Sequence, residues 1–139
     1  MSRFYCCVSS FAIISSAFVS SAAMAQSGVY SGTVDVFKDI ASNCHISVIF
    51  DPIGMKADVS IASPESFCAY WSINSNPHEY SVSGTTITIQ DVNMDPNRCF
   101  DDLIATYDSV NDTVSVDDEL TDRDGGRNCF ITSNGPLMH

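Results

Sequence analysis

The chain consists largely of short runs in which apolar and polar residues alternate, and each run ends at a turn signal. A period of two places apolar side chains on one face of a strand, whereas a helix needs a period near 3.6. Asp51-Pro52-Ile53-Gly54 and Ser83-Gly84 are typical turn signals between such runs. The runs that we expect to form strands are residues 30–36, 44–50, 56–61, 67–73, 80–82, 85–89, 99–107, 113–116 and 129–132.

This rhythm predicts an all-β fold, because no segment shows the periodicity of a helix. About eight or nine short strands with regular turn signals are typical of a sandwich or a barrel. Alternation supplies one apolar face per strand, which is what each sheet of a sandwich buries. We therefore expect an Ig-like antiparallel β-sandwich formed by residues 26–139 as a single domain.

The first 25 residues follow a different pattern. Arg3 precedes an apolar stretch, and Ala23-Met24-Ala25 matches a small-residue cleavage site. This order is typical of a cleavable secretory signal peptide, with Gln26 as the first mature residue. A retained membrane anchor is the alternative, but serines interrupt the stretch, and a spanning helix needs about 20 apolar residues. We expect a secreted, extracellular or cell-surface protein, or alternatively a periplasmic one, with no membrane insertion after cleavage.

Four of the six cysteines lie after residue 25, and an even number in a small exported chain predicts a disulfide framework. We favour the pairs Cys44–Cys68 and Cys99–Cys129 among the three possible pairings, because each closes a local loop between neighbouring strands. A zinc site made by all four thiolates is the alternative, but its ligands usually lie two to four residues apart, and these gaps are much wider.

The composition is strongly acidic, with 17 Asp and Glu against six Lys and Arg and a formal net charge of −11. Since Arg3 lies in the expected signal peptide, the mature chain would carry a net charge of −12. Nucleic acids and anionic membranes bind basic surfaces, so neither is expected as a partner. The charge favours solubility, weak cation binding and a basic partner.

Two candidate binding sites stand out. Asp117, Asp118, Asp122 and Asp124 lie in the most acidic segment and are candidate ligands for a weak calcium site, since Ca²⁺ takes hard oxygen ligands from flexible loops. An ordinary turn at Asp124-Gly125 is the alternative reading of that segment, and no other cofactor is expected. Tyr70 and Trp71 are a candidate aromatic platform for a ligand, or else pack against the disulfide of Cys68.

No catalytic motif is evident, and we predict no catalytic residue. A Gly-x-Ser-x-Gly elbow is missing from the sequence, and disulfides would leave the mature chain no cysteine nucleophile. His45, His78 and His139 form no local metal motif and are expected at the surface. Asp101 and Asp102 are adjacent on a strand and should face opposite sides, which disfavours a shared site.

The order of features resembles the PraB-like family of small exported bacterial proteins, the activators of alkane oxidation, some of which act as biofilm adhesins. The resemblance covers nearly all of residues 26–139. It implies a non-enzymatic, surface-associated protein and carries over no catalytic residue. The residues that carry it are Tyr30-Ser31-Gly32-Thr33, Cys44, Cys68 after Pro64-Glu65-Ser66, Trp71, the run 87–92, Cys99 and Cys129-Phe130-Ile131.

These observations favour a secreted or cell-surface protein, not an enzyme, that binds or builds structure in adhesion, a biofilm or a fibre. The expected partner is a protein or a polysaccharide at the cell surface, or further copies joined through edge strands. One alternative is a periplasmic or secreted inhibitor of a basic enzyme such as lysozyme, because an acidic domain complements a basic one. An exported hydrolase, with its site assembled from distant residues, is a second alternative.

Overall fold

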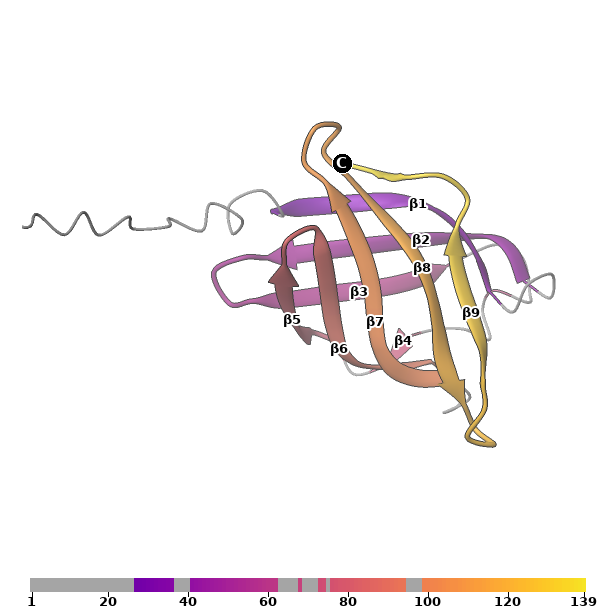
Figure 1. Ribbon diagram of the computed structural model, residues 1–139. Helices are drawn as coiled ribbons and strands as arrows, with labels where there is room; N and C mark the ends of the chain where they lie inside the picture. The colour runs from indigo at the N-terminus through magenta and orange to yellow at the C-terminus, as the bar shows by residue number, and fades with distance from the viewer. Residues whose placement is uncertain (1–26, 37–40, 63–67, 69–72, 75, 95–98) are drawn as a thin grey trace, which may run out of the picture.

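The computed structural model describes residues 27–36, 41–62, 68, 73–74, 76–94 and 99–139. Ten strands make up the regular structure of these segments (Figure 1). They are β1 (Gly28–Val36), β2 (Ala41–Asp51), β3 (Lys56–Ala62), β4 (Ile73–Asn74), β5 (His78–Ser83), β6 (Thr86–Met94), β7 (Cys99–Asp108), β8 (Thr113–Asp122), β9 (Arg127–Ser133) and β10 (Leu137–Met138).

Eight of these strands close into an antiparallel barrel in which neighbours in space are also neighbours along the chain. The order is β1, β2, β3, β5, β6, β7, β8 and β9, and the pairing of β1 with β9 closes the ring. The short β10 continues the line of β9, because it too pairs with β1 and β8. The two-residue β4 lies off the ring and pairs with β6.

The expected Ig-like β-sandwich is therefore wrong, although the expected all-β, antiparallel character is correct. Val34 of β1 pairs with Ser133 of β9, and Val36 pairs with Ile131. A sandwich would leave these two strands in separate sheets or at sheet edges. Alternation along each strand is the same in both architectures, so it cannot distinguish them.

The barrel interior is filled with the apolar members of each alternating pair. In β3, for example, Ala57, Val59 and Ile61 are buried, whereas Asp58 and Ser60 are exposed. The interior of an eight-stranded barrel is just wide enough for side chains to fill. The alternation seen in the sequence thus produces a single core inside the ring of strands.

A β-bulge interrupts the alternation of β6. The pairing with β7 shifts between Ile89 and Val92, and Asp91 has a φ of 52°. Ile89 is buried before the bulge and Val92 is buried after it, so the one extra residue of the bulge brings Val92 to the inward face. Asp91 is exposed as a result, on the outside of the barrel.

Both predicted disulfides are confirmed. Cys44 is bonded to Cys68, and Cys99 is bonded to Cys129, with all four residues buried. The second bridge links β7 to β9 across β8, which pairs with both. Disulfides persist in oxidising compartments, so the protein belongs outside the cytoplasm, in the periplasm or the exterior.

Within the described segments, no helix is long and apolar enough to cross a membrane.

Candidate functional site

Three tight turns and the free ends of β1 and β10 meet at one end of the barrel, which we call the hairpin end. The turns join β2 to β3 (residues 52–55), β5 to β6 (residues 84–85) and β7 to β8 (residues 109–112). The register places them together, since Gly28 pairs with Phe50 and Met138 pairs with Thr113. Figure 1 shows the β2–β3 turn at the left and the β7–β8 turn at the top, beside the C-terminus.

Four buried aromatic rings fill the barrel at the hairpin end, and we call them the aromatic plug: Tyr30, Phe50, Tyr80 and Tyr107. The ring centroid of Tyr30 lies 5.9 Å from that of Phe50 and 6.3 Å from that of Tyr107, in edge-on arrangements. Phe50 meets Tyr80 in the same way at 5.0 Å. Edge-to-face contacts of this kind stabilise aromatic clusters beyond the area that they bury.

The carboxylate of Asp112 ties the aromatic plug to the β7–β8 turn. Its Oδ1 accepts hydrogen bonds from the hydroxyl groups of Tyr30, at 2.7 Å, and Tyr107, at 2.9 Å. Its Oδ2 lies 3.6 Å from Nδ1 of His139, whose ring packs 5.2 Å from that of Tyr30. Gly28 lies beside this imidazole and has a φ of +125°, a backbone conformation that residues with a Cβ rarely adopt.

The plug and the carboxylate shift each other's pKa. Burial, followed by the hydrogen bond to Asp112, raises the pKa of Tyr30 and of Tyr107 above the ordinary value. The two hydroxyl donors, Tyr30 first, lower the pKa of Asp112. At neutral pH the phenols therefore stay protonated and the carboxylate stays charged, so both hydrogen bonds to Asp112 are kept.

These directions also set the pH range in which the cluster stabilises the fold. Because folding raises the tyrosine pKa, the tyrosines stabilise the fold fully below their pKa in the unfolded chain, which is about 10. This stabilisation is lost as the pH rises through their pKa in the folded protein. Because folding lowers the pKa of Asp112, this carboxylate stabilises the fold above its pKa in the unfolded chain, which is about 3.9. This stabilisation is lost as the pH falls through its pKa in the folded protein. The cluster is thus complete over the whole neutral range.

The β2–β3 and β7–β8 turns are built in the same way. Each follows an aspartate, Asp51 or Asp108, whose Oδ1 accepts the backbone N–H two residues later, at 3.0 Å and 2.9 Å. A longer contact reaches the next N–H, at 3.3 Å and 3.4 Å. The last residue of each turn has a positive φ, 49° at Met55 and 52° at Asp112. Such side-chain-to-backbone bonds fix the shape of a turn.

Both turns place an aliphatic side chain at their apex. Ile53 is 97% exposed and Val110 is 89% exposed, each two residues after the capping aspartate. Seven large apolar side chains are exposed in the described part of the chain, and all but Phe100 lie at the hairpin end: Val29, Ile49, Ile53, Met55, Val110 and Met138. Scattered exposed apolar residues are ordinary, whereas their concentration at one end makes the hairpin end the candidate surface for binding.

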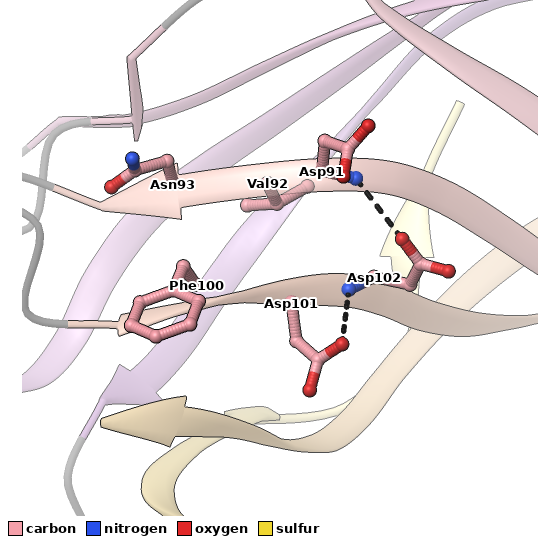
Figure 2. Close-up of a pocket in the computed structure, with 6 residues that line it drawn as sticks. All are labelled: Asp91, Val92, Asn93, Phe100, Asp101 and Asp102. Carbon is pink, nitrogen blue, oxygen red and sulfur yellow. Dashed lines mark hydrogen bonds between the residues drawn. The ribbon is translucent and has the colours of Figure 1, made fainter. Parts of the chain in front are cut away.

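A separate surface pocket of about 310 Å³ lies beside the bulge of β6. Figure 2 shows that Asp91, Asp101 and Asp102 all line it. Asp102 donates its N–H to Asp101 Oδ1, and its own Oδ1 accepts the N–H of Asp91, both at 3.0 Å. The first of these bonds, with the hydroxyl of Thr121, lowers the pKa of Asp101. The carboxylates of Asp101 and Asp102 thus accept hydrogen bonds from nearby backbone N–H groups.

The three histidines lie in separate parts of the chain, on β2, at the start of β5 and after β10. His45 is exposed on β2, and His139 is partly exposed beside Asp112. His78 was expected at the surface in a loop, which is wrong: it begins β5 and is 4% exposed. Its Nδ1 donates to the carbonyl of Gln90 at 3.1 Å, and its Nε2 has no partner among the residues described. The structure brings no two of them together as a catalytic or metal pair.

The four candidate calcium ligands, Asp117, Asp118, Asp122 and Asp124, are spread along β8 and the β8–β9 turn. Asp118 Oδ2 accepts the N–H of Ile104 at 2.6 Å. Asp122 Oδ1 accepts two N–H groups of its own turn, at 2.8 Å and 3.0 Å. In the described segments no three His, Cys, Asp or Glu gather as a metal site. The calcium site stays a prediction.

The aromatic platform, Tyr70 and Trp71, lies outside the described residues.

The apices Ile53 and Val110 were missed from the sequence. Each lies between two expected strands, where an aliphatic residue carries no catalytic or metal-binding signal. The shared pattern of an aspartate followed two residues later by Ile or Val, in both loops, was the available clue.

In comparisons with family models, with curated proteins and with solved structures, the chain matches none of them, so its function must be argued from the hairpin end itself.

Proposed function

We propose that this protein is a secreted or cell-surface binding protein without enzymatic activity, and that it recognises another protein through the hairpin end. One observation carries the proposal: six of the seven exposed large apolar side chains in the described segments lie at that end. The oxidising location that the two disulfides require agrees with it. So does the surface-associated role implied by the resemblance to the PraB-like family.

The energetics favour recognition by the turn apices. Complete burial of an aliphatic side chain such as Ile53 or Val110 contributes about 1.5–3 kcal/mol. The aspartate caps already hold both turns in shape, so little conformational entropy is lost when a partner binds. Exposed apices on rigid turns are therefore favourable binding determinants, and they have no role in the core.

A protein partner suits this surface better than a polysaccharide or a strand-to-strand contact. Aliphatic side chains offer no hydrogen bonds to sugar hydroxyl groups. Each of the eight barrel strands already pairs with two neighbours, so no strand of the ring is an open sheet edge along its whole length. The proposal therefore places recognition on the turns and not on the sheet.

Cell fractionation with chemical cross-linking and non-reducing gels tests this function. We expect the native protein in the periplasmic or extracellular fraction, in disulfide-bonded form, with part of it in a larger cross-linked complex. The double variant Ile53→Ser/Val110→Ser should lose most of that complex, because both apices are removed. Phe100→Ser is the matched control, since Phe100 is 44% exposed but lies away from the hairpin end.

Unchanged complex formation by the double variant, together with loss in the control, would refute the proposal. Because both substituted side chains point into solvent, the variants should keep the native melting temperature, and circular dichroism checks this. A cytoplasmic, reduced protein would also contradict the account.

A further inference from the structure

We infer that the partner at the hairpin end is a basic protein, which contacts the β2–β3 and β7–β8 turns together. This inference rests on the proposed function and specifies the chemistry of the partner. It combines the apolar apices with a second observation, the distribution of charge around them.

The hairpin end is acidic. Asp51 and Asp108 start the two apex turns, Asp112 ends the second, and Glu79 lies on β5 opposite Lys56. Lys56 is the basic residue at this end in the described segments, and its Nζ is 2.8 Å from Glu79 Oε1. Carboxylates thus lie beside each apolar apex, and they outnumber the basic residues at this end.

The remaining basic residues that the structure describes lie at the opposite end of the barrel. Arg123 is in the β8–β9 turn and Arg127 begins β9, and Arg127 donates to the carbonyl of Glu119 at 2.6 Å. That end also carries carboxylates, among them Asp101, Asp122 and Asp124, so the hairpin end is distinguished by carboxylates that accompany exposed aliphatic side chains. A partner that approaches the hairpin end meets carboxylates and aliphatic side chains.

The carboxylates at the turns are charged at neutral pH. Hydrogen bonds from the Asn111 side chain and the Val110 N–H lower the pKa of Asp108. Lys56 lowers the pKa of Glu79 through a hydrogen bond and its charge. These groups keep their negative charge well below neutral pH, so the electrostatic field at this end is constant under physiological conditions.

Charge decides among the possible occupants. A second copy would bring an identical acidic end against the first, and the whole chain carries a net charge of −11. An anionic membrane is repelled in the same way. A basic protein is attracted, and its Lys and Arg side chains can pair with the rim carboxylates while the apices enter apolar depressions. A basic enzyme such as lysozyme belongs to this class.

Binding of the purified chain to basic proteins tests the inference. The probes are lysozyme and cytochrome c, each compared with its lysine-acetylated form, at low and at physiological salt. We expect binding to at least one native probe, a loss of tenfold or more on acetylation, and weakening by salt. Ile53→Ser and Val110→Ser should each weaken binding about tenfold, whereas Phe100→Ser should change it less than twofold.

Asp51→Asn/Asp108→Asn keeps the turns, because asparagine caps them equally well, but removes two charges. We expect this variant to bind the basic probe more weakly and with less dependence on salt. Equal binding to native and acetylated probes overturns the basic-partner inference and leaves the proposed function standing.

Two other outcomes also overturn the inference. Absence of binding to both native probes does so, as does a homodimer that Ile53→Ser/Val110→Ser dissociates. Binding that is sensitive to salt but unaffected by either apex variant overturns the inference and the proposed function together. These outcomes separate the charge of the partner from the location of the surface.

Discussion

Replacing Cys99 and Cys129 with alanine is expected to lower the free energy of unfolding by about 3–4 kcal/mol. The bridge closes a segment with a sequence separation of 30, so its removal releases chain entropy in the unfolded state. Small domains have total stabilities of about 5–15 kcal/mol. The variant should therefore lose a large share of its stability and unfold at a much lower denaturant concentration.

Guanidinium unfolding of the oxidised protein measures this loss. Cys44→Ala/Cys68→Ala is the matched control, because its bridge has a separation of 24 and should contribute nearly as much. A loss below about 1 kcal/mol for the Cys99 and Cys129 variant would mean that the bridge does not constrain the unfolded chain as proposed.

Replacing Tyr30 with alanine is expected to lower the free energy of unfolding by about 3–5 kcal/mol. Tyr30 is fully buried and lies at the centre of the aromatic plug, in contact with Phe50, Tyr107 and His139. Its removal leaves a cavity and takes away one of the two hydroxyl groups that donate to Asp112 Oδ1. Thermal or denaturant unfolding at neutral pH gives the value, and a loss below about 1 kcal/mol would contradict the packing described.

Tyr30→Phe separates the hydrogen bond from the packing. This variant keeps the ring and should lose only about 1–2 kcal/mol. Above about pH 10 the native protein should lose stability as its tyrosines ionise, and this alkaline loss should be smaller in the variant. Equal pH profiles for the two proteins would show that Tyr30 does not resist ionisation in the folded state.

Strands and disulfides follow from local signals in this sequence. Alternation such as Ala57, Val59 and Ile61 locates strands because only one face is buried, and loop length favours the pairing of cysteines that are close in sequence. The closure of the barrel depends on the contact of β1 with β9, and no local signal encodes a pairing between the first and the last barrel strands. The sandwich was expected for that reason.

The candidate site was less predictable, because its residues become informative only in three dimensions. His78 was placed in a loop beside Pro77, yet the start of β5 turns it into the barrel. Asp91 leaves the core face of β6 because of a bulge, and a bulge has no simple sequence signature. Ile53 and Val110 belong to turns that are far apart in sequence, and the antiparallel register brings them to one end.

Site-specific photo-cross-linking in cells tests the central claim most directly. A photoreactive amino acid is placed at position 53, 110 or 100 of the full chain, and the adducts are compared after irradiation. We predict strong adducts with one protein partner from positions 53 and 110, and weak or no adduct from position 100. Adducts that are equally strong from position 100, or absent from positions 53 and 110, would contradict recognition through the hairpin end.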